Sequence, residues 1–378
     1  MHSTKIWLSP PHMGGQEQKY IQEVIANNWV SSVGPAITLF EESLEHYLGT
    51  GSVVALNSGT SAIHLALIML GVKAGDEVLC QSMTFSASAN PILYQGAIPI
   101  FVDSELDTWN ICPVALEHAI QDRIAKGKKP KAIIAVHLYG VPYQVTAVRA
   151  LADQYGIPII EDAAEALGSS YKGKLCGTFG DIGIFSFNGS KVITTSSGGA
   201  MVLPNSDWKE KAIFFATQSK DKAVHYEHSE LGYNYRMSTI CAAIGQGQME
   251  VLTSHLAKRN AMHTFYEEVF ENYPGITVYT VPNSDYSANY WLTTILINSA
   301  LANGITPEIV RLGLEAQAIE SRPLWKPMHL QPLFKNAPYY GNAISESLFE
   351  KGLCLPSGSN LTKEERDKIK AVLLDILN

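Results

Sequence analysis

The chain has 378 residues, of which 46% are hydrophobic and 17% are charged, and it carries a formal net charge of −8. This composition excludes a disordered or fibrous protein, and the length favours one large domain with a smaller companion. No basic run is longer than residues 126–129, so binding to nucleic acid or to an anionic membrane is not expected.

The cysteines and the N-terminal segment indicate a cellular compartment. Five cysteines stand singly, without the spacing of a metal site, and we therefore expect neither a disulfide framework nor a bound metal. The first residues lack the apolar core of a signal peptide, and no apolar stretch approaches the length of a membrane span. The sequence thus predicts a soluble, cytoplasmic protein.

Apolar residues recur at helical spacing over 17–28 and 36–48, which predicts two N-terminal helices, the second ending at Gly49. Beyond them, short β-branched runs alternate with amphipathic segments. The runs are 53–56, 77–81, 98–102, 132–138 and 157–160. Such alternation predicts an α/β fold with a mainly parallel sheet that helices cover on both faces.

The pattern changes after residue 238. The predicted elements are helices at 239–252 and 257–273, a strand at 291–297, a helix at 307–315 and a terminal helix after Thr362. Together they predict a smaller α+β domain. We place the large domain at 1–250 and the small domain at 251–378.

Two chemically capable side chains follow predicted buried strands. Acids that include Asp162 follow the run 157–160, and Lys191 follows the apolar run 183–187. If these strands are parallel neighbours, both side chains reach one cleft. A lysine there can form a Schiff base, and a carboxylate can hold a ring nitrogen, which is the pair that pyridoxal phosphate needs. Taken singly, a lysine is usually a solvated charge, and an acid after a strand is often a helix cap.

A turn of small residues at 57–61 lies between a predicted strand and a predicted helix. Free N–H groups and the dipole at a helix N-terminus suit a phosphate. Gly59 permits close approach, and the hydroxyls of Thr60 and Ser61 add donors. An ordinary Ser/Thr helix cap explains the same turn.

Two further side chains are placed near the same end of the sheet. Phe85 follows the strand 77–81 and is predicted either to stack on a planar cofactor or to be a core aromatic. Ser186 alternates with Phe185 and Phe187, so its hydroxyl points away from those rings and is expected to meet the phosphate.

The order and spacing of these motifs resemble the DegT/StrS-type sugar-nucleotide aminotransferases, which are fold type I enzymes dependent on pyridoxal phosphate. The resemblance extends through essentially the whole chain. It is carried by residues 29–35, 40–41, 57–61, 99–103, 137–140, 161–165, 232–236 and 322–329. Within the family, segments 8–15 and 186–195 look closest to aminotransferases that make UDP-4-amino-4,6-dideoxy-N-acetylglucosamine.

The resemblance implies a mainly parallel seven-stranded sheet with a smaller C-terminal α+β domain. It implies Lys191 as the Schiff-base lysine and Asp162 as the partner of the ring nitrogen. The implied cofactor-binding residues are Gly59, Thr60, Ser61, Phe85, Asp162, Glu165, Ser186, Asn188, Lys191 and Asn234, and the implied substrate-binding residues are Arg236, Arg322, Trp325, Lys326 and His329. Asn234 would act in the neighbouring subunit of a homodimer with shared active sites. Glu165 stands where glutamine is frequent in relatives.

The resemblance further implies a reaction. Glutamate would donate an amino group to the 4-keto position of a nucleotide-linked 4-keto-6-deoxy sugar, expected to be a UDP-linked N-acetyl sugar, for surface glycan biosynthesis. A sugar dehydratase on the same scaffold is an alternative, but relatives with that chemistry replace the lysine by histidine, and Lys191 is present. A non-catalytic cofactor-binding regulator is a second alternative, although the sequence has no basic helix-turn-helix.

Overall fold

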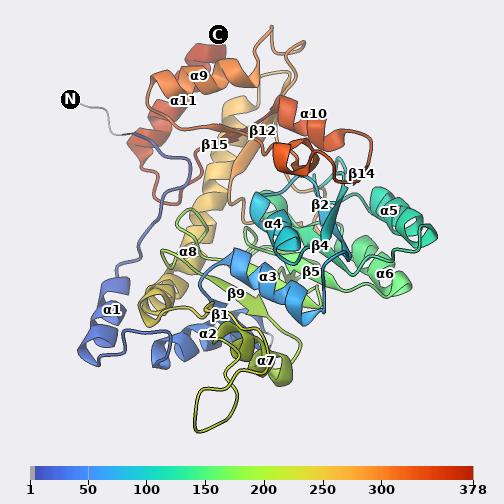
Figure 1. Cartoon of the computed structure of the whole chain (residues 1–378). Coiled ribbons are helices and arrows are strands. Elements are labelled where there is room, and N and C mark those ends of the chain that lie inside the picture. Colours follow the sequence, from blue (N-terminus) through green and yellow to red (C-terminus); the bar gives the residue numbers. More distant parts are fainter. Residues whose placement is uncertain (1–4, 50, 378) are drawn as a thin grey trace.

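The computed structural model describes residues 5–49 and 51–377, and its centre is a mainly parallel sheet (Figure 1). In spatial order the strands are β1 (Val53–Leu56), β9 (Gly199–Val202), β8 (Ile182–Ser186), β5 (Ile159–Asp162), β4 (Ala132–Val136), β2 (Glu77–Gln81), β3 (Ile98–Val102) and β14 (Tyr339–Tyr340). Strand β9 is antiparallel to both neighbours, and the other pairs are parallel. The predicted parallel α/β sheet is confirmed, but the expected seven strands become eight because the short β14 adds to the edge at β3.

Helices cover the sheet because its strands are apolar on both sides. They are α3 (Gly59–Met69), α4 (Ser86–Tyr94), α5 (Pro113–Ala125), α6 (Val145–Tyr155) and α7 (Ser206–Ala216). Alternate residues of the central strands belong to separate buried clusters, one packed with α3, α4 and α7 and another with α5 and α6. This two-sided burial is what a near-continuous apolar run in a parallel strand requires.

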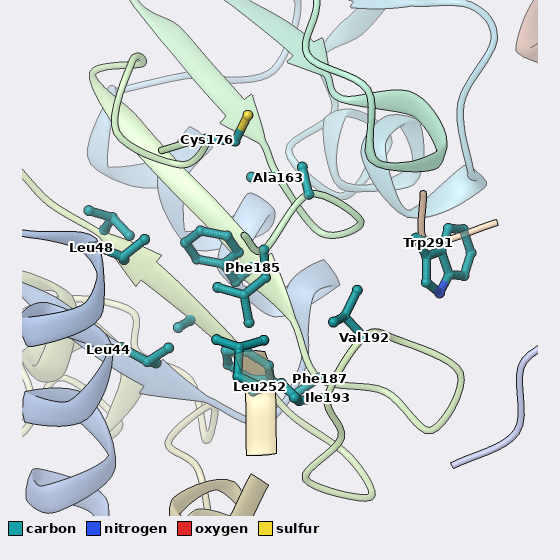
Figure 2. Packing of buried hydrophobic residues seen from close by; sticks show 14 of the residues in the cluster. Leu44, Leu48, Ala163, Cys176, Phe185, Phe187, Val192, Ile193, Leu252 and Trp291 are labelled. Atoms are coloured by element: carbon teal, nitrogen blue, oxygen red, sulfur yellow. The ribbon is translucent and has the colours of Figure 1, made fainter. Parts of the chain in front are cut away.

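The N-terminal helices lie where the periodicity predicts them, as α1 (Glu17–Ala26) and α2 (Pro35–Leu48). Gly49 ends α2 in the left-handed conformation, with φ of 63°. Both helices pack against α8 (Thr239–Phe270). The third core cluster, at the α2 and α8 side of the sheet, contains Leu44, Phe185, Phe187 and Leu252 (Figure 2).

The prediction of two helices at 239–252 and 257–273 is wrong, because α8 is continuous. The polar residues between them interrupt the apolar pattern, yet one of them, His255, is buried, at 2% exposure. No glycine or proline stands at 252–258 to end the helix. Burial of polar side chains, which periodicity of apolar residues cannot detect, therefore extends the helix.

The C-terminal part forms a second layer of structure above the main sheet, reached through α8 (Figure 1). Its antiparallel sheet has the order β10 (Ile276–Val278), β12 (Thr293–Ile297), β15 (Gly352–Leu355) and β13 (Arg322–Pro323), with α9 (Pro307–Ala316), α10 (Ile344–Lys351) and α11 (Lys363–Leu377) around it. A small three-stranded sheet is formed by β11 (Tyr286–Ser287), β6 (Ser170–Tyr171) and β7 (Lys174–Leu175). The proposed domain boundary at residue 250 falls inside α8.

Two further findings concern the described residues as a whole. None of their helices combines the length and apolarity needed to cross a bilayer. The five cysteines are unpaired, and three of them, Cys80, Cys176 and Cys354, are buried.

Candidate active site

A cleft of about 690 Å³ opens beyond the carboxyl ends of the parallel strands. In open α/β sheets this edge is where ligands bind, because strand ends and helix N-termini converge there. Of the predicted site residues, those that line the cleft are Gly59, Thr60, Phe85, Asp162, Glu165, Ser186, Asn188, Lys191, Arg322 and Trp325. The structure thus brings together side chains that lie up to 266 positions apart between Gly59 and Trp325.

Asp162 is fixed at one end of the cleft by the main sheet. It is the last residue of β5 and is paired in register with Val136 and Ile184 on the neighbouring parallel strands. Its Oδ2 accepts a hydrogen bond of 2.6 Å from the Ser88 hydroxyl, and its Oδ1 accepts the N–H of Ala164 at 3.1 Å. A buried carboxylate held in this way presents a fixed negative charge to a ring in the cleft.

Lys191 reaches the cleft from an irregular segment. Residues 187–198, which we call the lysine loop, contain no helix or strand between β8 and β9. The Lys191 Nζ lies 3.1 Å from Glu165 Oε1 and 4.0 Å from the centre of the Trp291 ring. The amine is therefore held between an acid and an aromatic face.

Glu165 is the unusual member of this group, because it is a carboxyl that is only 4% exposed. Burial raises the pKa of Glu165 to about 7, while Lys191 and the Tyr139 N–H oppose that rise. The Tyr139 N–H donates to Glu165 Oε2 at 2.8 Å. The carboxyl can accordingly gain or lose a proton near neutral pH, next to the amine of Lys191.

The turn before α3 forms a small cradle against the ends of β8 and β9. Ser58 caps the helix by accepting the Ser61 N–H at 3.0 Å. A Cβ on Gly59 would lie 3.1 Å from the Ser186 Cβ, and a Cβ on Gly199 would lie 2.4 Å from the Gly59 nitrogen. Glycine is thus required at 199, and little room remains for a side chain at 59, so the helix N-terminus approaches Ser186 closely, and the result suits a phosphate group.

Two predictions for this turn have different outcomes in the structure. Thr60 lines the cleft beside Gly59. The Ser61 hydroxyl instead lies 2.9 Å from the Ser58 hydroxyl, within the helix cap, and Ser61 is not among the lining residues. Ser61 therefore belongs to an ordinary Ser/Thr helix cap, whereas Thr60 lines the cleft.

The Phe85 ring has the exposure that a stacking residue needs. Although it precedes α4 at the end of a buried strand, its side chain is 56% exposed and its ring is tilted toward Trp325, with centroids 5.5 Å apart. A core aromatic would be covered, so the open ring face in the cleft fits a planar ligand ring. Together with Asp162, Lys191 and the cradle at α3, it gives each part of pyridoxal phosphate a matching group in this chain.

Besides Ser61, four predicted residues lie outside the cleft of this chain. Arg236 donates to Glu41 and to the Ala55 carbonyl, so its guanidinium joins α2 to β1. His329 stacks on Tyr339 at 3.8 Å, and its Nδ1 lies 2.7 Å from the Ser82 hydroxyl. Lys326 and Asn234 are exposed away from the lining, and for Asn234 the prediction concerns a neighbouring subunit. A motif places a residue in the sequence, but it does not fix where its side chain points.

Sequence reasoning missed several residues that hold the site. Ser88 orients Asp162, and Trp291 lies under the amine of Lys191. Trp291 falls within the predicted strand 291–297, but β12 begins at Thr293 and the tryptophan lies before it. No sequence pattern marks Ser88, whereas a large aromatic at the start of a strand in the small domain was a usable signal for Trp291.

One cluster of metal-ligand types has a structural explanation. The ligand atoms of His137, Glu161 and Cys176 lie within 4.8 Å of one another and are buried. The Glu161 oxygens, however, accept the N–H groups of Gly177, Phe179 and Gly180 at 2.6–2.7 Å, and His137 Nε2 lies 2.7 Å from Oε1. These bonds use the carboxylate to fix the loop after β7 to β5, and we propose no ion here.

Comparisons with known proteins identify the family to which the chain is similar. The model of the "DegT/DnrJ/EryC1/StrS aminotransferase family" matches residues 11–374. A "Putative pyridoxal phosphate-dependent aminotransferase EpsN" from Bacillus subtilis is 49% identical and covers 100% of this chain and 97% of its own length. The "GDP-perosamine synthase" of Caulobacter vibrioides is 36% identical over 99% of this chain and 98% of that protein.

Solved structures of similar fold include two aminotransferases. One is described as a DegT DnrJ EryC1 StrS aminotransferase from Brucella abortus, with a TM-score of 0.89 and 29% identity over 96% of this chain and 95% of the other. The second is "Helicobacter pylori PseC, aminotransferase involved in the biosynthesis of pseudoaminic acid", with a TM-score of 0.89 and 26% identity over 99% of each chain.

Proposed function

The chain belongs to the DegT/DnrJ/EryC1/StrS aminotransferase family and is a pyridoxal phosphate-dependent sugar aminotransferase, and we propose that it aminates a nucleotide-linked 4-keto-6-deoxy sugar at the 4-keto position, with glutamate as donor. The single observation that supports this best is the joint presence of Asp162, Lys191 and the N-terminus of α3 in one cleft. We further propose that the product serves surface glycan biosynthesis.

Each residue of the site has a proposed task. When bound, pyridoxal phosphate supplies an aldehyde that binds amines and a ring that withdraws electrons. Lys191 anchors the cofactor and, once released, moves a proton at the carbon that carries the transferred amine. Asp162 keeps the ring nitrogen protonated through its fixed negative charge. Gly59, Thr60 and Ser186 hold the phosphate, and the Phe85 ring stacks on the cofactor ring.

We propose that Glu165 takes part in proton transfer to and from the amine of Lys191. Its carboxyl lies 3.1 Å from the amine, and burial raises its pKa to about 7. Because that pKa lies near neutral pH, the Glu165 carboxyl can accept or return a proton beside the freed amine.

The sugar-binding part of the cleft is formed by the C-terminal unit. Arg322 is 65% exposed in its side chain and donates to Glu320 at 2.7 Å, and both residues line the cleft with Trp325. We propose that the Arg322 guanidinium meets the diphosphate and that the Trp325 ring packs on the sugar or base. Arg236, Lys326 and His329 are not used in this proposal, because they do not line the cleft.

The nucleotide is proposed to be uridine diphosphate on an N-acetyl sugar, as the segments 8–15 and 186–195 imply. A GDP-linked sugar is a second candidate, because the relative from Caulobacter vibrioides is named "GDP-perosamine synthase". The 4-keto position is common to both proposals. The two candidates differ in the nucleobase and in the N-acetyl group of the sugar, both of which lie away from the reacting carbon.

The test uses purified holoenzyme and glutamate labelled with heavy nitrogen, with a panel of UDP-, GDP- and dTDP-linked 4-keto-6-deoxy sugars. Mass spectrometry of the products reports which acceptor gains the label. We expect the label in the UDP-linked N-acetyl amino sugar. Label only in a GDP-linked product would support the second candidate, and unlabelled product from every acceptor would overturn glutamate as donor. Dehydration without nitrogen transfer would support a dehydratase.

A further inference from the structure

Arg259 on α8 is a buried arginine without an acidic partner. It is 1% exposed and is the largest of the fully buried side chains. Within residues 5–49 and 51–377 it forms no salt bridge, and its Nε has no hydrogen-bond partner. Burial lowers the pKa of the guanidinium to about 10. A cation that is buried without an acidic partner lowers the stability of the fold, so the presence of Arg259 here indicates a role other than simple packing.

The four hydrogen bonds of Arg259 connect three separate parts of the chain. One terminal nitrogen donates to the Trp291 carbonyl at 2.6 Å and to the Ser357 carbonyl at 3.1 Å, both in the C-terminal unit. The other nitrogen donates to the Ser9 hydroxyl at 3.1 Å and to the Lys191 carbonyl at 3.4 Å. A planar guanidinium with donors in a fixed fork can hold several acceptors at once, which an ammonium cannot do in the same geometry.

The same partners also hold the residue before Lys191. The Ser190 carbonyl accepts the Ser9 hydroxyl at 2.8 Å and the Trp291 indole N–H at 2.6 Å. Arg259, Ser9 and Trp291 therefore form a connected set around the carbonyls of Ser190 and Lys191, which we call the arginine clamp. The set is independent of the contact between Lys191 Nζ and Glu165.

The lysine loop needs such contacts because it has no secondary structure of its own. On one side it is anchored by apolar packing: Val192 and Ile193 are 4% and 1% exposed and point into the core beside Phe187 (Figure 2). Trp291 belongs to the same buried cluster, and its indole N–H also donates to the Ser190 carbonyl. The arginine clamp supplies the polar anchor at 190–191, and the two anchors together determine where the Lys191 side chain leaves the backbone.

We propose that Arg259 is a positioning residue for Lys191, which fixes the lysine loop to the C-terminal unit and to the N-terminal segment so that the amine meets the cofactor. This inference rests on the proposed role of Lys191. Arg259 does not line the cleft and touches neither cofactor nor substrate; it acts through the main chain. Its effect on chemistry is the effect of holding a reactive group in place.

The experiment compares Arg259→Met and Arg259→Lys with the wild type, first as cofactor-free full-length protein. Hydrogen exchange read by mass spectrometry is expected to increase in 188–194 in both variants, and more in Arg259→Met, while the strands of the main sheet keep their protection. Pyridoxal phosphate is then added and fixed with borohydride. We expect attachment at Lys191 to be about 10-fold slower or more, and kcat of the holoenzyme to fall about 10- to 100-fold with little change in KM.

The matched control is Arg123→Met. Arg123 is an 11% exposed arginine that pairs with the buried Glu77 on the far side of the sheet, so the control also removes a guanidinium from a partly buried place. It should leave exchange in 188–194 unchanged. Ser9→Ala, which removes one hydroxyl from the clamp, provides a milder variant if Arg259→Met does not fold, and we expect a smaller increase in the same segment.

Unchanged exchange in 188–194, an equal increase in every element, or the same increase in Arg123→Met would each overturn the proposal. Normal attachment of pyridoxal phosphate at Lys191 in a folded Arg259→Met protein would also overturn it. The exchange measurement needs no sugar and no amino donor. The exchange result can therefore be interpreted even if the proposed sugar reaction is not observed. Each of the two proposals can be contradicted without contradicting the other.

Discussion

Asp162 and Lys191 occupy one cleft, but the chain holds them by different means. Asp162 ends a strand whose main chain is bonded on both sides, at Val136 and Ile184. Lys191 belongs to a loop without regular structure, and its position depends on side chains from α8, from the N-terminal segment and from the C-terminal unit. The acid end of the site is thus built by the sheet, and the amine end by long-range side-chain contacts.

This difference indicates which part of the site is more sensitive to substitutions. The strand β5 keeps its register when a side chain on it is replaced, because the ladder uses backbone groups. The lysine loop has no such ladder at 190–191, so a substitution far from the cleft can displace the amine. Substitutions at the two ends of the site should therefore differ in their effects on activity and on stability.

Lys191→Ala removes the amine and is expected to abolish nitrogen transfer, because among the described residues that line the cleft no other lysine could anchor the cofactor and move the proton. The measurement is labelled product by mass spectrometry, with thermal unfolding as the check on the fold. Borohydride should no longer attach the cofactor to a peptide that contains position 191. Turnover at the wild-type rate would refute the assignment of Lys191.

Asp162→Asn tests the acid end. It retains the shape of the side chain and a partner for Ser88, but it loses the charge, so we expect kcat to fall about 10²- to 10⁴-fold with little loss of folding stability. Steady-state kinetics and denaturation report the two effects. The control is Asp153→Asn on α6, where the acid is 67% exposed. Loss of stability in proportion to the loss of activity would contradict the comparison.

Glu165→Gln should change how stability depends on pH. Burial raises the pKa of Glu165 from 4.5 to about 7 in the folded protein, so the folded state holds this proton more tightly than the unfolded state. The contribution of this proton to the free energy of unfolding is complete below pH 4.5. It is lost as the pH rises to about 7. That interval corresponds to about 3 kcal/mol of unfolding free energy.

The measurement for Glu165→Gln is chemical denaturation of the cofactor-free protein across this pH interval. The wild type should lose more stability than the variant as the pH rises, and Glu42→Gln, an exposed acid on α2, should behave as the wild type does. Parallel curves for the wild type and Glu165→Gln would be evidence against a raised pKa.

Ser88→Ala is expected to have the smallest effect. It removes the 2.6 Å donor to Asp162 Oδ2 but leaves the strand and the Ala164 N–H in place. The loss of one hydrogen bond to a charged group corresponds to about 1.5–3 kcal/mol, and we expect a reduction in kcat of about 10-fold, well below the effect of Asp162→Asn. A reduction as large as that of Asp162→Asn would show that orientation, rather than charge, is what Asp162 provides.

Much of the fold could be predicted because it follows local patterns. The alternation of apolar runs and amphipathic segments indicated the parallel sheet, and an acid directly after an apolar run indicated a side chain at its edge. The break predicted in α8 is wrong because the helix continues through a segment in which a polar residue, His255, is buried. The side chains of Arg236 and His329 contact neighbours outside the cleft lining, because a sequence motif does not determine which neighbour a charged side chain contacts.

The layers of the fold, the acid at the end of β5 and the glycine turn before α3 follow directly from the sequence, because each depends on residues close together in the chain. How Lys191 is held depends on contacts that form only in the folded chain. Its main chain is bound by Arg259, 68 positions away, and the Ser190 carbonyl is bound by Ser9, 181 positions away. Such partners are selected by packing in three dimensions, and no periodicity along the chain records them.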